Sequence, residues 1–596
     1  MLCLTSSCWL LSQQPDAFES LLASAQQAQA RSDFASAADF YKQAVAIHPE
    51  IPELKANLGL MYYQSGKDEQ AVAAFQQAIR LKPALFVPNL FLGLDYIRLK
   101  RFKEAIPYLK RAALSKPIEV QTHLGLGEAY AGTGETRLAT ASYLRATEVA
   151  PENADAWYHL GVSYLEQVEA DARILLTRHK DSGYLRVLIA DNFFDQKAFA
   201  AAAETYKNAL LLPSVPAGTH ASYGFALIHQ HDLQAAEREL NAELKENHGS
   251  LLAKLGLARL QIEQGATEEA ANRIQEIWKT DRGFLRANIA KFEAGMEQSR
   301  RSELQRVLDG REAAGELSPG FVAAFRGDSV SDSHDRADSI KDTSRSNSAT
   351  VGAAHLYASG NYPQALAAAQ KLALSAATES EGLYWETKSA QKLATEALGR
   401  ASQMDSGSPK LHVLLGDLYR QRQFFPDSEQ EYRKALALAP NDTGALFGLA
   451  LALLADNQLD QAFDVAQSAL KNNADDPELN AVMGEILCAR DDYPGAEPFL
   501  KKSLNTKPEY VSHVHALLGS VYAKTNRTQE AIAELKLALA DDNDGHIHYQ
   551  LARLYLKVGD RDAAKQAFEI SNRLRSEGLN RSAVAMQETS VDKDWQ

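Results

Sequence analysis

Residues 58–83 read LGLMYYQSGKDEQAVAAFQQAIRLKP, and the same residue types return 34 positions later and again after a further 34. In the first copy the repeated places hold Leu58, Gly59, Tyr62, Ala71, Phe75, Ala78 and Pro83. In the second copy they hold Leu92, Gly93, Tyr96, Ala105, Tyr108, Ala112 and Pro117, with Tyr108 one residue short of the register. In the third they hold Leu126, Gly127, Tyr130, Ala139, Tyr143, Ala146 and Pro151. A fixed period of this length indicates stacked supersecondary units rather than one globular core.

Each period predicts two short helices joined by a polar turn. Gly59 and Ala71 are small where the two helices must cross closely, and a larger side chain there would overpack the contact by roughly 1–3 kcal/mol. Phe75 is expected to fill the space that these small residues leave. Pro83 ends the second helix because it lacks an N–H and disfavours helix in the residue before it. No single pair can bury its apolar face alone, so neighbouring repeats must stabilise one another.

This pattern resembles the tetratricopeptide repeat (TPR) family, and the resemblance extends over nearly the whole chain. It implies an all-α superhelical solenoid of helix-turn-helix repeats. It also implies that the chain holds other proteins or peptides, which is the usual role of the family, without specifying the partner.

The small residue of each first helix forms two series along the chain. The first series is Ala25, Gly59, Gly93, Gly127, Gly161, Ala190, Gly224 and Ala258. The second series is Ala353, Thr387, Gly416, Ala450, Gly484, Gly519 and Ala552. The steps are 33 to 35 residues, except for Gly161 to Ala190 and Thr387 to Gly416, which are both 29. The two series superpose at an offset of 226, which indicates a duplicated block of about five repeats.

The two short repeats lack a glycine turn, because neither residues 166–180 nor residues 383–398 contain Gly or Pro. Two interpretations are open. The helices of the short repeat are fused into one long helix, which would leave a kink or groove in the solenoid, or they are joined by a very tight turn. In the second case the deletion is simply tolerated in a connecting turn.

Changes in composition along the chain predict where each repeat array begins and ends. The stretch 327–350 is rich in Ser and Asp and contains no aromatic residue, so it cannot bury enough apolar area to offset its ordering entropy. The predicted organisation is an apolar N-terminal segment 1–16, a first TPR array 17–283, capping helices 284–326, a disordered linker 327–350, a second TPR array 351–571 and a polar C-terminal tail 572–596.

The overall composition excludes several classes of protein. The chain has 596 residues, 45% of them hydrophobic, and a net charge of −14, which argues against nucleic acid as the main partner because phosphate binding needs a basic face. Only three cysteines are present, Cys3, Cys8 and Cys488, so no disulfide framework is expected. No stretch is long enough to span a membrane. Residues 1–14 are the one localisation signal: the protein is exported, for example to the periplasm, if they are a truncated signal sequence, and cytoplasmic otherwise.

Motifs of catalysis are not found. The sequence has no GxxxxGK[ST] loop, no HExxH, no paired CxxC and no GxSxG, so neither an enzyme nor a cofactor is expected. One histidine group suggests a metal site, since His513, His515, His546 and His548 lie at equivalent places in adjacent repeats. The alternative is a scaffold position, because the slot of His515 and His548 also holds histidine in other repeats, namely His123, His220 and His412.

The predicted binding surface is the concave face, formed by one stripe of each first helix. Its apolar members are Val87, Leu90, Leu94, Tyr158, Val162, Phe225, Phe447, Leu451 and Tyr549. Its acidic members are Glu128, Asp191, Asp417 and Glu485. About half of these residues are expected to pack between neighbouring helices, and the others to form an apolar and acidic groove for an extended or helical partner segment. The paired Lys and Asn with which some family members clamp a C-terminal carboxylate are absent at the matching places.

The sequence therefore predicts a non-catalytic scaffold that binds partner proteins or peptide segments in its concave groove. The alternative is an accessory subunit or peptide-sensing regulator of an enzyme or of a secretion or assembly complex. The oligomeric state is not specified by the sequence.

Overall fold

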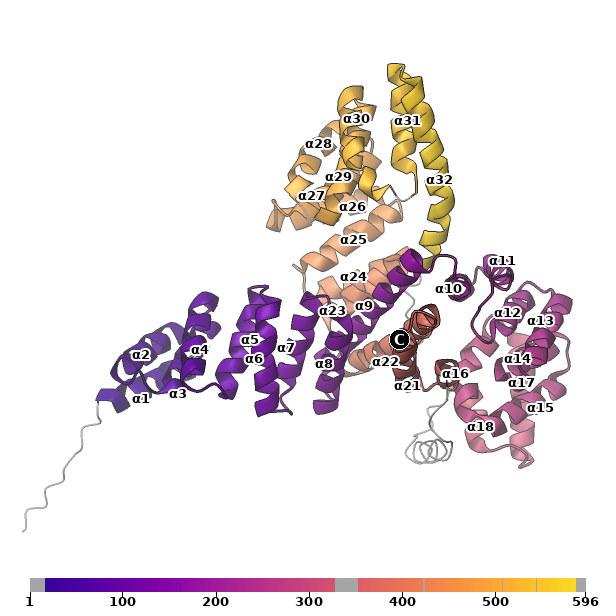
Figure 1. Cartoon of the computed structure of the whole chain (residues 1–596), viewed down its shortest axis with the longest axis horizontal. Helices are drawn as coiled ribbons and strands as arrows, with labels where there is room; N and C mark the ends of the chain where they lie inside the picture. Colours follow the sequence, from indigo (N-terminus) through magenta and orange to yellow (C-terminus); the bar gives the residue numbers. More distant parts are fainter. Residues whose placement is uncertain (1–16, 327–351, 422–423, 506–507, 543, 586–596) are drawn as a thin grey trace, which may run out of the picture. The chain divides into compact units, whose positions relative to one another are not determined.

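The computed structural model describes residues 17–326, 352–421, 424–505, 508–542 and 544–585, and these residues form α-helices with two short 3₁₀ turns and no β-strand (Figure 1). The all-α TPR solenoid prediction is confirmed. The predicted N-terminal segment 1–16 and linker 327–350 lie outside the described residues. Of the predicted tail, the part up to Ala585 continues the last helix. No helix in the described ranges combines the length and apolarity needed to cross a membrane.

The chain divides into two compact units, residues 1–164 and 165–596, and the boundary falls inside one long helix. In the first unit each helix packs against the next along the chain. Its helices are α1 (Ala17–Ala30), α2 (Phe34–Ile47), α3 (Pro52–Gln64), α4 (Asp68–Leu81), α5 (Phe86–Arg98), α6 (Phe102–Ser115), α7 (Val120–Gly132), α8 (Thr136–Val149) and the start of α9 (Ala154–Arg178).

The second unit contains the rest of α9 and all later helices. Before the undescribed segment 327–351 they are α10 (Gly183–Asp195), α11 (Phe199–Ala209), α12 (Thr219–His229), α13 (Leu233–Glu246), α14 (Leu251–Glu263), α15 (Thr267–Thr280), α16 (Arg282–Glu293), α17 (Gln298–Ala313) and α18 (Pro319–Arg326). After it they are α20 (Ala353–Ala358), α21 (Tyr362–Leu372), α22 (Glu379–Met404), α23 (Pro409–Gln421), α24 (Phe425–Leu438), α25 (Thr443–Ala455), α26 (Leu459–Asn472), α27 (Pro477–Ala489), α28 (Tyr493–Lys502), α29 (Pro508–Lys524), α30 (Thr528–Leu537), α31 (His546–Val558) and α32 (Arg561–Ala585).

Small-on-large packing joins the two helices of a repeat. A Cβ atom added at Gly59 would lie 2.6 Å from the ring of Phe75, and one added at Gly416 would lie 2.6 Å from the ring of Tyr432. These glycines are therefore required by the close approach of the partner ring. At Gly93 the partner is Leu109, 2.5 Å away, and not the predicted aromatic. Tyr108, one residue earlier, lies beside Tyr96 instead, with a ring centroid separation of 5.7 Å.

The short repeats are single helices. α9 runs unbroken over 25 residues and α22 over 26, so in both arrays the helix pair of the short repeat is fused. This selects the first of the two interpretations, and the tight turn is wrong. The loss of the Gly turn explains the fusion, because nothing in either stretch stops a helix.

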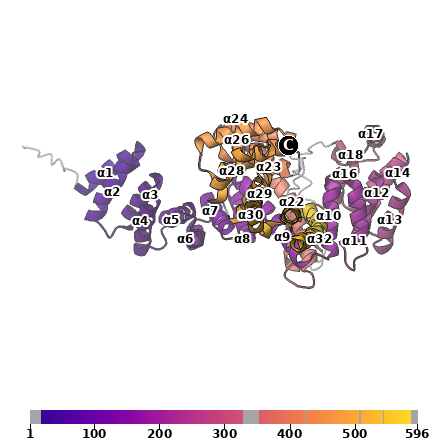
Figure 2. The ribbon, with the colours of Figure 1, turned by 90° about the horizontal axis from the view of Figure 1, so that it is seen from above.

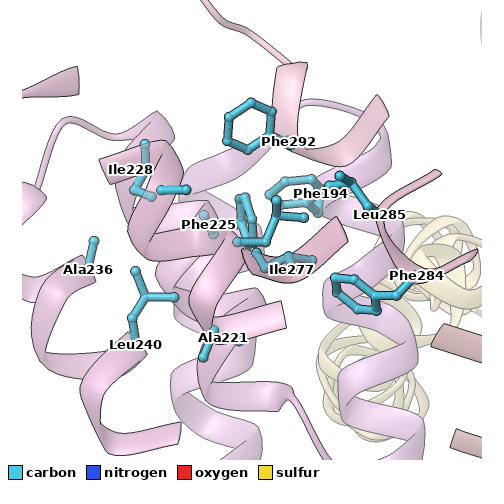
Figure 3. Packing of buried hydrophobic residues seen from close by; sticks show 14 of the residues in the cluster. Phe194, Ala221, Phe225, Ile228, Ala236, Leu240, Ile277, Phe284, Leu285 and Phe292 are labelled. Carbon is cyan, nitrogen blue, oxygen red and sulfur yellow. The ribbon is translucent and has the colours of Figure 1, made fainter. Parts of the chain in front are cut away.

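The predicted capping region consists of three helices, α16, α17 and α18. Phe292 in α16 takes the register place of a small residue and is fully buried beside Phe325 of α18. Figure 3 shows Phe292, Phe284 and Leu285 in the same cluster as Phe194 and other core residues. The capping helices thus close the core of the repeats before them.

Candidate protein-interaction surface

The predicted surface residues follow one register, which we call the first-helix stripe. It comprises the residue directly after the small residue of each first helix, and the residues three and six positions before the small residue on the same helix face. Glu128, Asp191, Asp417 and Glu485 occupy the place directly after the small residue. An apolar residue stands in the same place at Leu94, Val162, Phe225 and Leu451.

In the first unit most of the stripe is accessible. Val87 is 37% exposed and Glu128 is exposed, while the side chains of Leu94, Tyr158 and Val162 are half-buried. Leu90 is buried in the stack, with 5% exposed, so it is a packing residue and not part of an open surface.

In the second unit the predicted residues fall into two classes. Asp417, Phe447, Leu451 and Glu485 are half-buried, and Tyr549 is 39% exposed. Phe225 and Asp191, in contrast, are buried. These two are therefore stripe residues that pack inside the chain and do not line an open groove, because other helices of the same unit cover them.

The residues that cover Asp191 form a buried hydrogen-bonded cluster. Its Oδ1 accepts a hydrogen bond from the Tyr206 hydroxyl at 2.5 Å, and its Oδ2 accepts from the Tyr384 hydroxyl at 3.0 Å and from Lys388 Nζ at 2.9 Å. Tyr206 belongs to α11 of the same repeat, whereas Tyr384 and Lys388 belong to α22. The helix α22 therefore packs against α10 (Figures 1 and 2), and two of its side chains cover the stripe position of Asp191.

Charge balance in this cluster sets the ionisation of its members. Burial alone would raise the pKa of Asp191, but the charges of Lys388 and Lys291 and the hydrogen bonds to its oxygens bring that pKa below its ordinary value. Burial opposes the charge of Lys388, yet Asp191 holds its pKa well above the ordinary value. Asp191 and Lys388 thus form a buried ion pair, and the two tyrosine hydroxyls donate further hydrogen bonds to the carboxylate.

Lys291 of α16 covers the stripe position of α12. Its Nζ donates to Ser222 Oγ at 3.1 Å and lies over the rings of Phe194 and Phe225, at 5.3 and 5.5 Å from their centroids. Burial lowers the pKa of Lys291. Phe225 is thus sealed by a side chain of the capping region.

Sequence reasoning missed Lys291, Tyr384 and Lys388. A signal for the last two was present, because Lys388 directly follows the small-residue place Thr387 and so holds a stripe position of its own repeat. The Lys388–Asp191 ion pair therefore joins the same register place of two different repeats, one basic and one acidic.

The part of α9 that belongs to the second unit also packs on α22. The amide of Gln167 donates to Glu386, and His179 Nε2 lies 3.0 Å from Glu379 Oε2. Because residue numbers rise along one helix while they fall along the other, the two fused helices run antiparallel. They are the equivalent short repeats of the two arrays.

The open counterpart of Asp191 is Asp417 on α23. Its Oδ1 accepts from the Tyr432 hydroxyl at 2.6 Å, and Arg420 Nη2 lies 3.5 Å from the same oxygen. The carboxylate side chain is 42% exposed. Four helices further along, Glu485 of α27 pairs with His513 Nε2 at 3.3 Å, and this hydrogen bond raises the pKa of His513.

The recurring histidines join the two helices of a repeat. In three repeats a histidine Nδ1 meets a glutamate 19 residues later, at 2.6 or 2.7 Å, in the pairs His220–Glu239, His412–Glu431 and His515–Glu534. His123 bonds instead to the carbonyl of Pro117 at 2.8 Å. The slot is thus a scaffold position, and a histidine with a glutamate 19 residues later was the sequence signal for it.

The four histidines of the suggested metal site have separate partners. His513 pairs with Glu485, His515 with Glu534 and His548 with Asp542, while His546 lies beside Gln550. Over the described ranges, no group of three or more His, Cys, Asp or Glu side chains is arranged to hold a metal ion. Cys488 is half-buried and its thiol pKa is raised to about 11 by burial.

Comparison with known proteins agrees with this geometry. Profiles of the tetratricopeptide repeat match residues 52–85, 92–139, 129–174, 413–477, 512–540 and 545–575. Anaphase-promoting complex subunit 7 from Homo sapiens is 24% identical over 174 residues, which are 29% of this chain and 30% of that protein, and the Mus musculus protein matches equally. The matched segment thus spans less than a third of these curated relatives.

Alignments with solved structures give low scores. The crystal structure of the APC/C hetero-tetramer Cut9-Hcn1 aligns over 95% of this chain and 96% of that chain, with 14% identity and a TM-score of 0.30. MamA from Desulfovibrio magneticus RS-1 aligns over 25% of this chain and 84% of that chain, with 22% identity and a TM-score of 0.24. Scores of this size do not indicate a shared overall arrangement. The repeated helix pairs, the small-on-large packing in register and the profile matches in both arrays show that the matched parts of this chain are built of tetratricopeptide repeats.

Proposed function

We propose that the chain is a non-catalytic scaffold that binds helical segments of partner proteins along the accessible parts of its first-helix stripe. One observation carries the proposal: the stripe of α10 already holds a helix, α22, through an aromatic side chain and a lysine. The register that holds α22 is repeated along the chain, and at several repeats it remains exposed. A surface that accepts a helix of its own chain has the dimensions and chemistry to accept another.

Two stretches of the stripe are available to a partner. In the first unit these are the positions around Leu94, Glu128 and Tyr158, and in the second unit those around Asp417 and Leu451. Both combine apolar side chains with a carboxylate. A partner segment with apolar and basic side chains on one helix face fits this combination.

A role as an accessory subunit of a larger complex is the second candidate. The long row of repeats, with two separate accessible stretches, favours the binding of more than one partner segment at once. The curated relatives are named as subunits of a complex, although the match covers less than a third of their length.

Site-specific photo-crosslinking tests the proposal. A photoreactive phenylalanine analogue is placed at Tyr158 or at Leu451 of the full chain, and at Gln77 as a control, because Gln77 is exposed on the second helix of its repeat. We expect defined protein adducts from the two stripe positions, which charge reversal of Glu128 weakens at Tyr158, and none of these adducts from Gln77. Identical adducts from all three positions, or none from either stripe position in cells that produce the protein, would contradict it.

A further inference from the structure

The internal duplication provides two copies of one local arrangement. At the offset of 226, Asp191 corresponds to Asp417 and Tyr206 to Tyr432. The structure repeats the contact as well as the sequence, because each tyrosine hydroxyl donates to the Oδ1 of its aspartate, at 2.5 Å in the first array and 2.6 Å in the second. Each pair orients a carboxylate with its second oxygen directed away from the tyrosine.

The two copies differ in the hydrogen-bond partners of the second carboxylate oxygen, Oδ2. Oδ2 of Asp191 receives Tyr384 and Lys388, which are four residues apart on α22 and therefore lie on one helix face. Oδ2 of Asp417 has no hydrogen-bond partner among the residues that the structure describes. Arg420 lies near Oδ1 only, and the Asp417 side chain is 42% exposed against 9% for Asp191.

We propose that Asp417 is the docking position for a lysine of a helical partner segment that carries an aromatic residue four positions before that lysine. The chemistry is taken from this chain: Tyr384 and Lys388 show what the Asp–Tyr arrangement binds when it is filled. The partner segment is therefore a helix that presents an aromatic residue and a lysine on one face. This inference rests on the proposed function and names one site of it.

The surroundings of Asp417 suit such a segment. Phe447 and Leu451 hold stripe places on α25, a first helix that packs against α23, and both are half-buried. Glu485 of α27 continues the negative charge along the stripe, with its side chain 34% exposed. A lysine that bonds Asp417 is thus placed on an apolar and acidic surface, where the charge pair is partly shielded from water.

The experiment uses a peptide of residues 379–391 with Glu379→Gln, Glu381→Gln and Glu386→Gln, which leaves Lys388 as its one charged side chain. The peptide is held helical by a staple on the face opposite Tyr384 and Lys388 and labelled with a fluorophore. Binding to the full chain is measured by fluorescence anisotropy. We expect saturable binding to the unsubstituted chain and at least about tenfold weaker binding to Asp417→Lys, with Asp417→Asn between them. A second peptide carrying Lys388→Glu should not bind.

The matched control is Asp464→Lys, which makes the same charge change at an exposed position on a second helix of the same array. Equal affinity for the unsubstituted chain and Asp417→Lys, or equal weakening by Asp464→Lys, would overturn the proposal, and so would absence of binding to the unsubstituted chain. Circular dichroism of each variant shows whether the fold is retained, and Asp417→Asn provides a milder variant if Asp417→Lys does not fold. Crosslinking from Tyr158 does not involve Asp417, so failure here leaves the general scaffold function separately testable.

Discussion

At the scale of single residues, the carboxyl of Asp95 in the first unit is buried without a hydrogen-bond partner among the described residues. Asp95 lies on α5 with its side chain fully buried. Arg98 Nη1 approaches one oxygen only to 4.0 Å. Burial, reinforced by the nearby charge of Asp68, raises the pKa of Asp95 from 3.8 to about 7.

This shift predicts how the stability of the first unit depends on pH. Below about pH 4 Asp95 is protonated in the folded and unfolded states and contributes nothing. As the pH rises from about 4 to 7 the unfolded chain loses the proton while the folded chain keeps it, so the free energy of unfolding falls. We expect Asp95→Asn to remove this loss and to stabilise the unit by about 1–3 kcal/mol at pH 8, with little effect at pH 4.

Chemical denaturation at several pH values measures the effect, followed by fluorescence in a background that keeps Trp157 as its single tryptophan. Asp39→Asn is the control, because Asp39 is exposed on α2. A difference between Asp95→Asn and the unsubstituted chain that stays constant from pH 4 to pH 8 would show that the carboxyl is not held protonated by burial.

At the scale of helices, two glycines in helix interiors are predicted to respond to alanine in opposite ways. At Gly416 the added Cβ would lie 2.6 Å from the buried ring of Tyr432, so Gly416→Ala should cost about 1–3 kcal/mol. At Gly310 in α17 no atom lies within 4 Å of the added Cβ, and the gain in helix propensity should stabilise by about 0.5–1 kcal/mol. Thermal unfolding of the two variants measures both signs, and a stabilised Gly416→Ala would contradict the small-on-large account.

Repeat packing was predictable because it joins residues about one period apart. Gly59 on Phe75 and Gly416 on Tyr432 belong to one helix pair, and the period places small and large residues opposite each other. The predicted partner was wrong at Tyr108: the large residue packed on Gly93 is Leu109, which is bulky but not aromatic. The absence of any helix breaker left the fused helices α9 and α22 as one of two open interpretations.

The covering of the α10 stripe by α22 was not predictable from the repeat period. Tyr384 and Asp191 are 193 residues apart, and their contact depends on how the repeats from α10 to α16 curve and where the next array begins. A repeat period carries information on neighbouring repeats and none on this curvature. Asp191 and Phe225 were therefore assigned to the open surface together with Asp417 and Leu451, from which sequence could not separate them.

At the scale of the whole molecule, the second unit is held together across the undescribed segment 327–351 by side-chain contacts of both arrays. Besides the Asp191 cluster, Asn288 of α16 donates to the carbonyl of Ala358, and Ser359 donates to Asp281 at 2.6 Å. Leu383, Tyr384 and Trp385 of α22 are buried in the same hydrophobic cluster as Phe225 and Phe292. The two arrays therefore share a core in this unit, and it should unfold as one cooperative body.

The ion pair between Asp191 and Lys388 provides the test of this shared core. Lys388→Met leaves the buried carboxylate without its cation, and Asp191→Asn leaves the buried ammonium without its anion, so each change should destabilise the second unit by about 3–5 kcal/mol. The double variant removes both charges, and its cost should fall well below the sum of the two single costs because neither partner is left unpaired.

Lys371→Met, at an exposed lysine of α21, is the control and should change stability by less than about 0.5 kcal/mol. Denaturation is followed by fluorescence in variants that each keep one tryptophan, Trp278 or Trp385 for the second unit and Trp157 for the first. If the two arrays share one core, the singles shift the transition of Trp278, which precedes the undescribed segment, together with that of Trp385, which follows it. A shift of the Trp385 transition alone, or additive costs in the double variant, would show that the arrays unfold independently and that the pair does not join them.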